Sequence, residues 1–207
     1  MRAKIVFAVP ATPVLPPRPA LQSLWRMSAR FRESVFFARL PSLALLTLAG
    51  HTPVGHALAY RDENVGDDPV KGGCDIAAIT AMTCQAARAY ELAAAFKRKG
   101  AHVVMGGAHP SVRPQEALRH ADTVIAGEAE ETWPAFLADF ARGRPKRFYA
   151  AARRPAYSFQ GSRIPRYDLA DIGRYRAMPV QAGRGCPLGC EFCSVETIHG
   201  RNYRHKE

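Results

Sequence analysis

Three cysteines near the end of the chain, Cys186, Cys190 and Cys193, have a spacing that can hold a metal cluster. They form a C-x3-C-x2-C pattern in a short loop that contains glycine, so their sulfurs can converge on one point. Thiolates are the ligands that iron–sulfur clusters select. A cubane cluster held by protein alone uses four cysteines, so three cysteines leave one iron open to a ligand that is not protein.

Zinc is the alternative metal for this loop. Zinc also takes Cys3His sites, and His199 or His205 could supply the fourth ligand. The usual zinc patterns, with two cysteine pairs or with one cysteine pair and one histidine pair, are absent from the sequence. Thiols that bind no metal are the third interpretation.

The composition is that of a globular, cytoplasmic protein. Of the 207 residues, 47% are hydrophobic, which is enough for a core of that size. No apolar run reaches the roughly 20 residues that cross a bilayer. The apolar run near Met1 is shorter than that of a signal peptide, and we interpret it as a first strand. Five cysteines, three of them in one loop, do not indicate a disulfide framework.

The net charge of +11 is concentrated in the last third of the chain. Residues 144–207 contain 13 Lys and Arg against 5 Asp and Glu, whereas residues 1–143 contain 16 against 13. These basic residues are mostly arginines spread through predicted loops, without aromatic residues at regular intervals. A solvated linker, or a face that meets a partner domain, is therefore favoured over a nucleic-acid site.

Alternating strand and helix patterns predict the fold class. Predicted strands cover residues 5–9, 56–61, 75–80, 102–105 and 123–126. Predicted helices cover residues 41–50, 83–99 and 114–121, and a further helix carries the apolar stripe from Trp133 to Phe140. This alternation indicates an α/β fold with a doubly wound sheet of five parallel strands and right-handed crossovers.

Two stretches are predicted to lie outside this pattern. Residues 21–40 have a ragged helical spacing that is typical of an insertion packed over a core. Residues 144–179 are predicted to be a linker, with at most a short hairpin around Arg147 to Ala150. Residues 178–184 then form a predicted strand that leads into the cysteine loop.

Glycines and small polar residues follow three of the predicted strands. In doubly wound sheets, ligands bind outside the carboxyl ends of the strands, and glycine there lets the backbone approach a bulky ligand. Tight turns are the plainer explanation for any one of these glycines. No G-x-G-x-x-G follows the first strand, so a dinucleotide is disfavoured. The candidate ligand contacts at these ends include Thr80, Thr83, Gly106, Gly107, Gly127 and Glu128.

The chain resembles the cobalamin (vitamin B12)-binding radical S-adenosylmethionine (radical SAM) enzymes from about Ile5 to Lys206. Besides the cysteine loop, with Phe192 before its last cysteine, several ordered segments match. These are residues 45–49, 62–64, 89–93, 106–109, 127–133 and 200–204. The resemblance implies a flavodoxin-like cobalamin domain (1–143), a linker (144–179) and the start of a partial (β/α)6 barrel (180–207).

The resemblance also implies cofactors and their contacts. Cys186, Cys190 and Cys193 would hold a [4Fe-4S] cluster, and the backbone of Phe192 would contact S-adenosylmethionine. Reductive cleavage of S-adenosylmethionine yields a 5′-deoxyadenosyl radical, and relatives commonly transfer a methyl group to an unactivated carbon or rearrange it. A flavodoxin or ferredoxin would be the reductant. The cobalamin contacts would be Thr80, Thr83, Gly106, Gly107, His109, Gly127 and Glu128.

The sequence departs from the family pattern in several places. The D-x-H-x-x-G motif is absent after Asp62, so no protein histidine is expected below cobalt. Ala44 and Ala129 stand where relatives often carry glycine. Only 14 residues follow Cys193, which predicts a truncated chain, inactive by itself, or one whose remaining barrel is a separate chain.

Two other functions remain open from the sequence. One is a methylthiotransferase-type radical SAM protein acting on RNA. Its N-terminal domain typically brings three further cysteines for a second cluster, and this chain has two, Cys74 and Cys84. The other is a non-enzymatic module that binds cobalamin or zinc.

Overall fold

The computed structural model describes residues 2–13, 40–150, 158–159 and 162–206. Its centre is a sheet of six parallel strands in the order β2-β1-β3-β4-β5-β6. The strands are β1 (Lys4–Val9), β2 (Ala57–Asp62), β3 (Ile76–Thr80), β4 (His102–Gly106), β5 (Thr123–Ala126) and β6 (Phe148–Ala150). The chain passes from β1 to β2 and then crosses back to β3, so the strand order reverses at β1.

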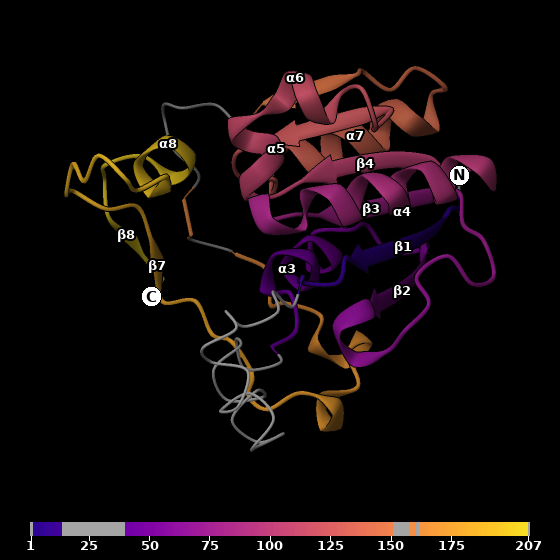
Figure 1. Ribbon diagram of the computed structural model, residues 1–207, viewed down its shortest axis with the longest axis horizontal. Coiled ribbons are helices and arrows are strands. Elements are labelled where there is room, and N and C mark those ends of the chain that lie inside the picture. Colours follow the sequence, from indigo (N-terminus) through magenta and orange to yellow (C-terminus); the bar gives the residue numbers. More distant parts are fainter. Residues whose placement is uncertain (1, 14–39, 151–157, 160–161, 207) are drawn as a thin grey trace, which may run out of the picture.

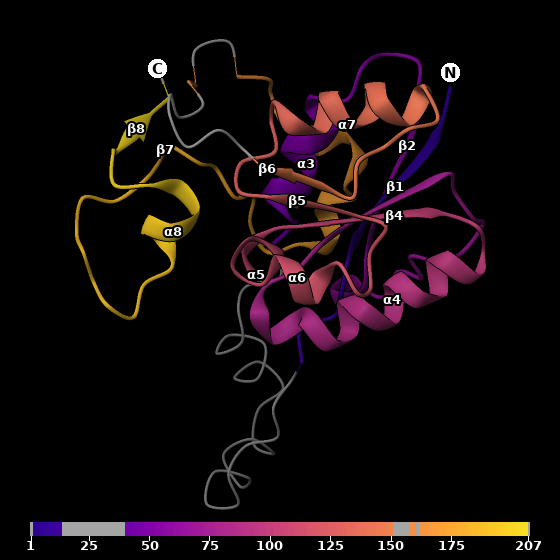
Figure 2. The same ribbon diagram turned by 90° about the horizontal axis from the view of Figure 1, so that it is seen from above.

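Helices cover both faces of this sheet (Figure 2). One face carries α3 (Leu43–Gly50) and α7 (Thr132–Ala141), and the other carries α4 (Ala86–Arg98), α5 (Ala108–Val112) and α6 (Pro114–Ala117). Each face of the sheet has its own hydrophobic core, and neighbouring residues of β1 contribute to both. Phe7 packs in the core with α3 and α7, and Val6 packs in the core with α4 and α6. The predicted α/β doubly wound fold is confirmed.

Helix α4 shows how the sequence sets these layers. Ala89, Leu92, Ala93 and Phe96 recur at helical spacing, and all four are buried against the sheet. The next glycine, Gly100, has φ of +80°, a conformation that ends a helix readily. The predicted helix began at residue 83, whereas the structure has a separate 3-10 turn, η3 (Thr83–Gln85), before α4.

The hairpin predicted around Arg147 to Ala150 is wrong. Residues 148–150 form β6, which adds to the sheet parallel to β5, with Ile125 opposite Tyr149. Only Tyr149 of the three residues is buried, and its hydroxyl donates to the Asp139 carboxylate at 2.9 Å. A three-residue edge strand with a single buried side chain is too short to produce an alternating pattern in the sequence.

Residues 162–179 of the predicted linker contact the sheet domain. They contain the 3-10 turns η4 (Tyr167–Leu169) and η5 (Ile172–Arg174). The backbone N–H of Arg166 donates to the Leu46 carbonyl on α3 at 3.0 Å, and the Tyr175 hydroxyl donates to the Asp62 carboxylate at 3.0 Å. These contacts fix the described part of the connection at both α3 and β2.

The cysteine loop belongs to a small unit that we call the C-terminal hairpin, residues 183–206. Its strands β7 (Gly183–Arg184) and β8 (Arg204–His205) pair antiparallel, and α8 (Val195–His199) lies between them. Of the strand predicted over residues 178–184, only the last two residues pair. Both views place this unit beyond the carboxyl ends of the sheet strands (Figures 1 and 2).

Two further sequence predictions concern helices. The insertion predicted over residues 21–40 lies outside the described residues except for Leu40. Within the part of the chain that the structure describes, no helix is long and apolar enough to cross a membrane.

Truncating Phe96 tests the packing of α4 on the sheet. Phe96 is 1% exposed, so Phe96→Ala leaves a cavity, and we expect the free energy of unfolding to fall by about 3–5 kcal/mol. Urea unfolding monitored by circular dichroism measures this loss. Ala94→Ser, at an exposed position of the same helix, is the control and should change the stability by about 0.5 kcal/mol or less. Similar small losses in both variants would contradict the described packing.

Candidate cofactor pocket and cysteine loop

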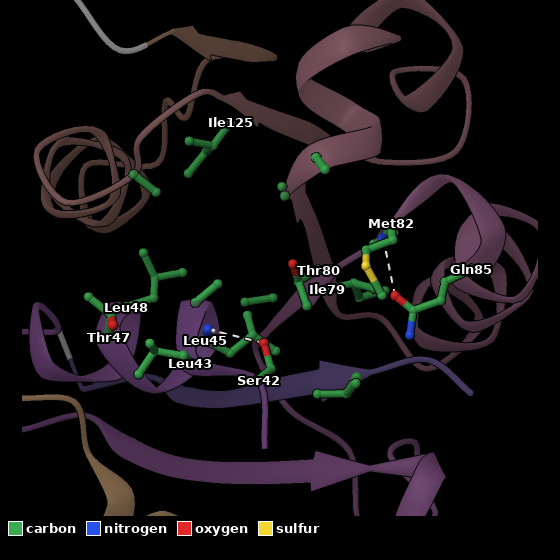
Figure 3. A pocket seen from close by; sticks show the side chains of 18 of the residues that line it. Ser42, Leu43, Leu45, Thr47, Leu48, Ile79, Thr80, Met82, Gln85 and Ile125 are labelled. Carbon is green, nitrogen blue, oxygen red and sulfur yellow. Dashed lines mark hydrogen bonds between the residues drawn. The ribbon is translucent and has the colours of Figure 1, made fainter. Parts of the chain in front are cut away.

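A cavity of about 970 Å³ opens at the carboxyl edge of the sheet. It is bounded by α3, by the ends of β1, β3, β4 and β5, and by the C-terminal hairpin. Figure 3 shows the leucines of α3 across the open space from Ile125, with Thr80 on a third side. Its volume is at the upper end of the range of about 300–1,000 Å³ that cofactor and ligand sites occupy.

Glycine is required where β4 leads into this cavity. Gly107 has φ of +95° and ψ of −169°, a region that is almost exclusive to glycine. A Cβ at this position would lie 2.5 Å from the Thr80 hydroxyl oxygen and 3.1 Å from the Ala81 nitrogen. The neighbouring turn after β5 is held by the Gly127 N–H, which donates to the Ser111 hydroxyl at 2.9 Å. Bare backbone therefore forms the pocket wall here.

Most of the residues predicted at the strand ends line the cavity. Those that do are Thr80, Gly106, Gly107, Gly127 and Glu128. Ala44 and Ala129, noted as departures from the family pattern, also line it. Thr83 is exposed at the start of η3 and is not among the lining residues.

His109 lies beside the cavity and does not line it. Its side chain is buried, and its Nε2 is 2.8 Å from the Tyr90 hydroxyl, which also donates to the Glu116 carboxylate at 3.1 Å. The backbone N–H of His109 donates to the Ala81 carbonyl at 3.0 Å. His109 thus joins α4, α5 and β3 behind the pocket wall.

Sequence reasoning covered the α3 side of the pocket only at Ala44, which the family resemblance placed near the cofactor. The helix itself was predicted, but its leucines were not assigned to a site, because an apolar helix face has the same pattern whether it meets a core or a ligand. Leu43, Leu45 and Leu48 all line the cavity. Ser42 begins α3, where its hydroxyl accepts from the Leu45 N–H at 3.4 Å, and its own N–H donates to the Tyr60 hydroxyl at 2.7 Å.

Gln85 is a second residue that the sequence did not single out. It is 5% exposed and lines the cavity from η3. Its side-chain amide donates to the Pro10 carbonyl at 2.9 Å and accepts from the Met82 N–H at 3.1 Å. Gln85 therefore ties the segment after β1 to the segment after β3. An isolated glutamine at the start of a helix gives no signal of this role.

A buried aspartate holds the turn after β2, which borders the pocket. Asp62 is 1% exposed and accepts from the side-chain amide of Asn64 at 2.8 Å and from the Tyr175 hydroxyl at 3.0 Å. Burial raises the pKa of Asp62 above its ordinary value, although these hydrogen bonds favour the ionised form. Asn64 and Glu63, which follow Asp62, line the cavity.

Glu128 faces the pocket but is bound to the C-terminal hairpin. Its carboxylate receives Arg204 Nη1 at 2.9 Å and Nη2 at 2.7 Å, and His199 Nδ1 lies 3.4 Å away. Burial by itself would raise the pKa of this carboxyl, but the hydrogen bonds and positive charges around it lower that pKa to about 2. Glu128 is therefore ionised at neutral pH, with its charge directed to the hairpin.

The cysteine loop is accessible and has free thiols. Cys186 is half-buried, and Cys190 and Cys193 are exposed. The Cys186 N–H donates to the Gly200 carbonyl at 3.2 Å, which closes the base of the loop. Within residues 2–13, 40–150, 158–159 and 162–206, no three His, Cys, Asp or Glu side chains lie close enough together to hold a metal ion. The predicted cluster ligands thus share one loop but are not gathered at one point.

The other two cysteines lie beyond the two opposite ends of β3. Cys74 precedes β3 and Cys84 follows it, and five strand residues span about 16 Å. Burial raises the pKa of the Cys74 thiol to about 11, so this thiol is a poor metal ligand at neutral pH. This placement does not suit a second cluster shared by Cys74 and Cys84.

Most of the residues that line the pocket lie in a region that matches a known family. Residues 43–137 match the family model described as the B12 binding domain. The chain is 35% identical over 172 residues to bacteriochlorophyllide d C-8(2)-methyltransferase of Chlorobaculum tepidum, covering 78% of this chain and 37% of that protein. It is 32% identical over 162 residues to bacteriochlorophyllide d C-12(1)-methyltransferase of the same organism, covering 72% and 34%.

Solved structures that share the fold include a cobalamin enzyme. The cobalamin-dependent S-adenosylmethionine radical enzyme OxsB with aqua-cobalamin bound superposes with a TM-score of 0.67 at 14% identity, covering all of this chain and 30% of that one. The chain thus spans about a third of the length of the proteins that it matches. Residues 43–137 are thus similar to the B12 binding domain, and the chain is similar in sequence to methyltransferases.

Adding a methyl group at Gly107 tests the tight wall of the pocket. Gly107→Ala should lower the free energy of unfolding by about 1–3 kcal/mol through backbone strain, and crowding against Thr80 adds to that loss. Thermal unfolding measures the effect. The control is Gly143→Ala, where φ is +73° and a Cβ meets no heavy atom within 4 Å. Equal losses in the two variants would show that Gly107 is not crowded.

Proposed function

We propose that this chain binds cobalamin in the cavity at the carboxyl edge of the sheet and forms part of a cobalamin-dependent radical SAM methyltransferase. The observation that carries the proposal is the position of the cavity. It lies at the strand ends, between α3 and β5, and most of its lining residues belong to the region that matches the B12 binding domain. Both relatives from Chlorobaculum tepidum are named as methyltransferases, which supports methyl transfer over other radical chemistry.

The residues of the cavity fit a large, flat, partly apolar cofactor. The leucines of α3 supply an apolar wall, and the bare backbone at Gly106, Gly107 and Gly127 lets the ring approach the sheet. Ser42, Thr80 and Gln85 supply polar atoms for a periphery that carries amides. We propose that these residues bind and orient cobalamin and exclude water from its buried face.

The cysteine loop would hold the second cofactor. Cys186, Cys190 and Cys193 supply three thiols, the donor set that an iron–sulfur cluster takes, and the hairpin that carries them lies beyond the edge of the sheet at which the cavity opens (Figure 1). We propose a [4Fe-4S] cluster with S-adenosylmethionine on its open iron and the Phe192 backbone nearby. Together these cofactors supply the radical and methyl chemistry, and a flavodoxin or ferredoxin supplies the electron. The protein holds the hairpin that carries the loop beside the cavity.

Filling the cavity from α3 tests cobalamin binding. Ala44 is an exposed residue of α3 that lines the cavity, so Ala44→Trp places an indole in the space proposed for the ring without disturbing the core. We expect one hydroxocobalamin per chain for the wild type, and a dissociation constant raised at least about tenfold in the variant, or about 1.4 kcal/mol. Titration followed by visible absorption measures both values.

The matched control for this experiment is Ala87→Trp. Ala87 is an exposed alanine of α4 that does not line the cavity, so the same substitution there should leave binding unchanged. Absence of binding to the wild type would overturn the cobalamin proposal. Wild-type affinity in Ala44→Trp would overturn the assignment to this cavity.

Anaerobic reconstitution with iron and sulfide tests the cysteine loop. We expect about four irons per chain, lost in Cys190→Ala and retained in the control Cys84→Ala. Metal analysis and the visible charge-transfer bands are the readouts. Zinc in the protein as isolated would instead support the binding module. A second cluster that depends on Cys74 and Cys84 would support the methylthiotransferase.

A further inference from the structure

Two carboxylates that follow β5 hold two arginines of the C-terminal hairpin. Glu128 receives both terminal nitrogens of Arg204, at 2.7 and 2.9 Å, and Arg184 Nη1 at 3.4 Å. Glu130 receives Arg184 Nη2 at 2.5 Å. We call these four residues the carboxylate clamp. The paired contact of Arg204 fixes direction as well as distance, because both the guanidinium and the carboxylate are planar.

The clamp is shielded from water. The Glu128 and Glu130 side chains are 8% and 5% exposed, and those of Arg184 and Arg204 are 11% and 16% exposed. The ring of Phe159 lies 5.2 Å from the Arg184 guanidinium carbon and 5.7 Å from that of Arg204. An aromatic face at these distances attracts a cation and keeps it desolvated. Removing a carboxylate partner from either arginine would therefore cost free energy, because the guanidinium would stay shielded from water.

The clamp lies between the cavity and the cysteines. Glu128, Glu130 and Arg184 line the cavity. Arg184 precedes Cys186 by two residues and pairs with Arg204 across the β7–β8 ladder. The two arginines therefore stand at the base of the loop that carries all three cysteines, and the clamp joins that base to the turn after β5.

Charged side chains make the main described attachment of the hairpin to the sheet domain, to which α8 adds a contact with α5 through a face where Val195 and Ile198 are half-buried. Among the described residues, neither of the two hydrophobic core clusters contains a residue of 183–206. The large apolar side chains Leu188, Phe192 and Tyr203 of the hairpin are 66%, 94% and 61% exposed. A ladder of two residues per strand is too short to be stable by itself. The position of the hairpin thus depends on the ion pairs at its base.

We propose that the carboxylate clamp seats the C-terminal hairpin, which carries the cysteine loop, at the mouth of the cavity, with Glu128 and Glu130 acting as positioning residues. The inference deepens the proposed function, and it rests on that function only for the identity of the groups that the cavity and the loop bind. It also gives Glu128 a role other than direct cobalamin contact. Loss of Glu128 removes the paired contact of Arg204, and loss of Glu130 leaves Arg184 with only its longer contact to Glu128. In either case the attraction at the base of the hairpin is weakened, so the hairpin separates from the sheet domain and its short ladder opens.

Hydrogen–deuterium exchange of the whole 207-residue chain without cofactors tests the proposal. The variants are Glu128→Gln and Glu130→Gln, which keep the shape of the side chain and remove its charge. In each, we expect the amides of Cys186 and Lys206, bonded to the Gly200 and Ala182 carbonyls, to exchange at least about tenfold faster. The amides of β1 and β3 should exchange as in the wild type, which shows that the sheet remains folded.

Two further variants separate charge from general damage. Glu131→Gln changes an exposed neighbour in the same turn and should leave hairpin exchange unchanged. Glu128→Asp restores the charge on a shorter side chain and should exchange more slowly than Glu128→Gln. Wild-type exchange of the hairpin in both Gln variants, or equal acceleration in β1 and β3, would overturn the proposal.

The result is independent of cobalamin. Exchange is measured on the protein without cofactors, so it decides whether the clamp seats the hairpin even if the wild type fails to bind hydroxocobalamin. That failure would overturn the proposed function alone. The alkylation rate of Cys186, which is half-buried, is a second readout and should rise in both Gln variants, while the rates of the exposed Cys190 and Cys193 stay the same.

Discussion

All six strands of the central sheet run in one direction, and the remaining features of this protein depend on that constraint. Parallel strands need crossover connections, which place helices on both faces and bring every carboxyl end to one edge. At that edge the chain leaves β1, β3, β4 and β5 in loops, and the strand order reverses at β1. The cavity opens there because the loops diverge where the strand order reverses. Glycine at position 107, with its positive φ, keeps the wall of that space thin.

The excess of arginine in the last third of the chain has a structural use. Arg174 pairs with Asp67 after β2 at 2.7 Å, and Arg184 and Arg204 pair with the carboxylates after β5. These arginines attach the C-terminal segments to the acidic turns of the sheet domain. From the sequence, these basic residues were interpreted as part of a solvated linker or of a face that meets a partner domain. The ion pairs described above join segments of the same chain. Buried pairs of this kind fix geometry more than they add stability, because desolvation offsets much of their attraction.

The C-terminal hairpin borders the cavity through charged side chains. The cavity is lined by apolar residues on the α3 side and by Glu128, Glu130 and Arg184 on the hairpin side. This asymmetry suits a site where a large cofactor packs its apolar face against the sheet domain and presents the other face to the hairpin. The proposed radical chemistry would need its reacting groups held at short, fixed distances, and a rigid sheet joined to a charged clamp would provide such a frame.

The sequence by itself determined the sheet domain, because its signals are local. Buried strands, the stripe on α4 and the glycines at the strand ends each appear within a few residues, and the C-x3-C-x2-C spacing identifies a thiol donor set without any fold. Only the tertiary structure decided which distant residues meet. The three residues of β6 became a strand by pairing with β5, the leucines of α3 became a pocket wall, and Glu128 found Arg204, a residue 76 positions away. His109 was placed behind the wall and not in it, because the direction of a side chain at the end of a strand depends on the turn that follows. Long-range pairs of this kind leave no periodic signal, so composition could show the excess of arginine in the last third of the chain but not its partners.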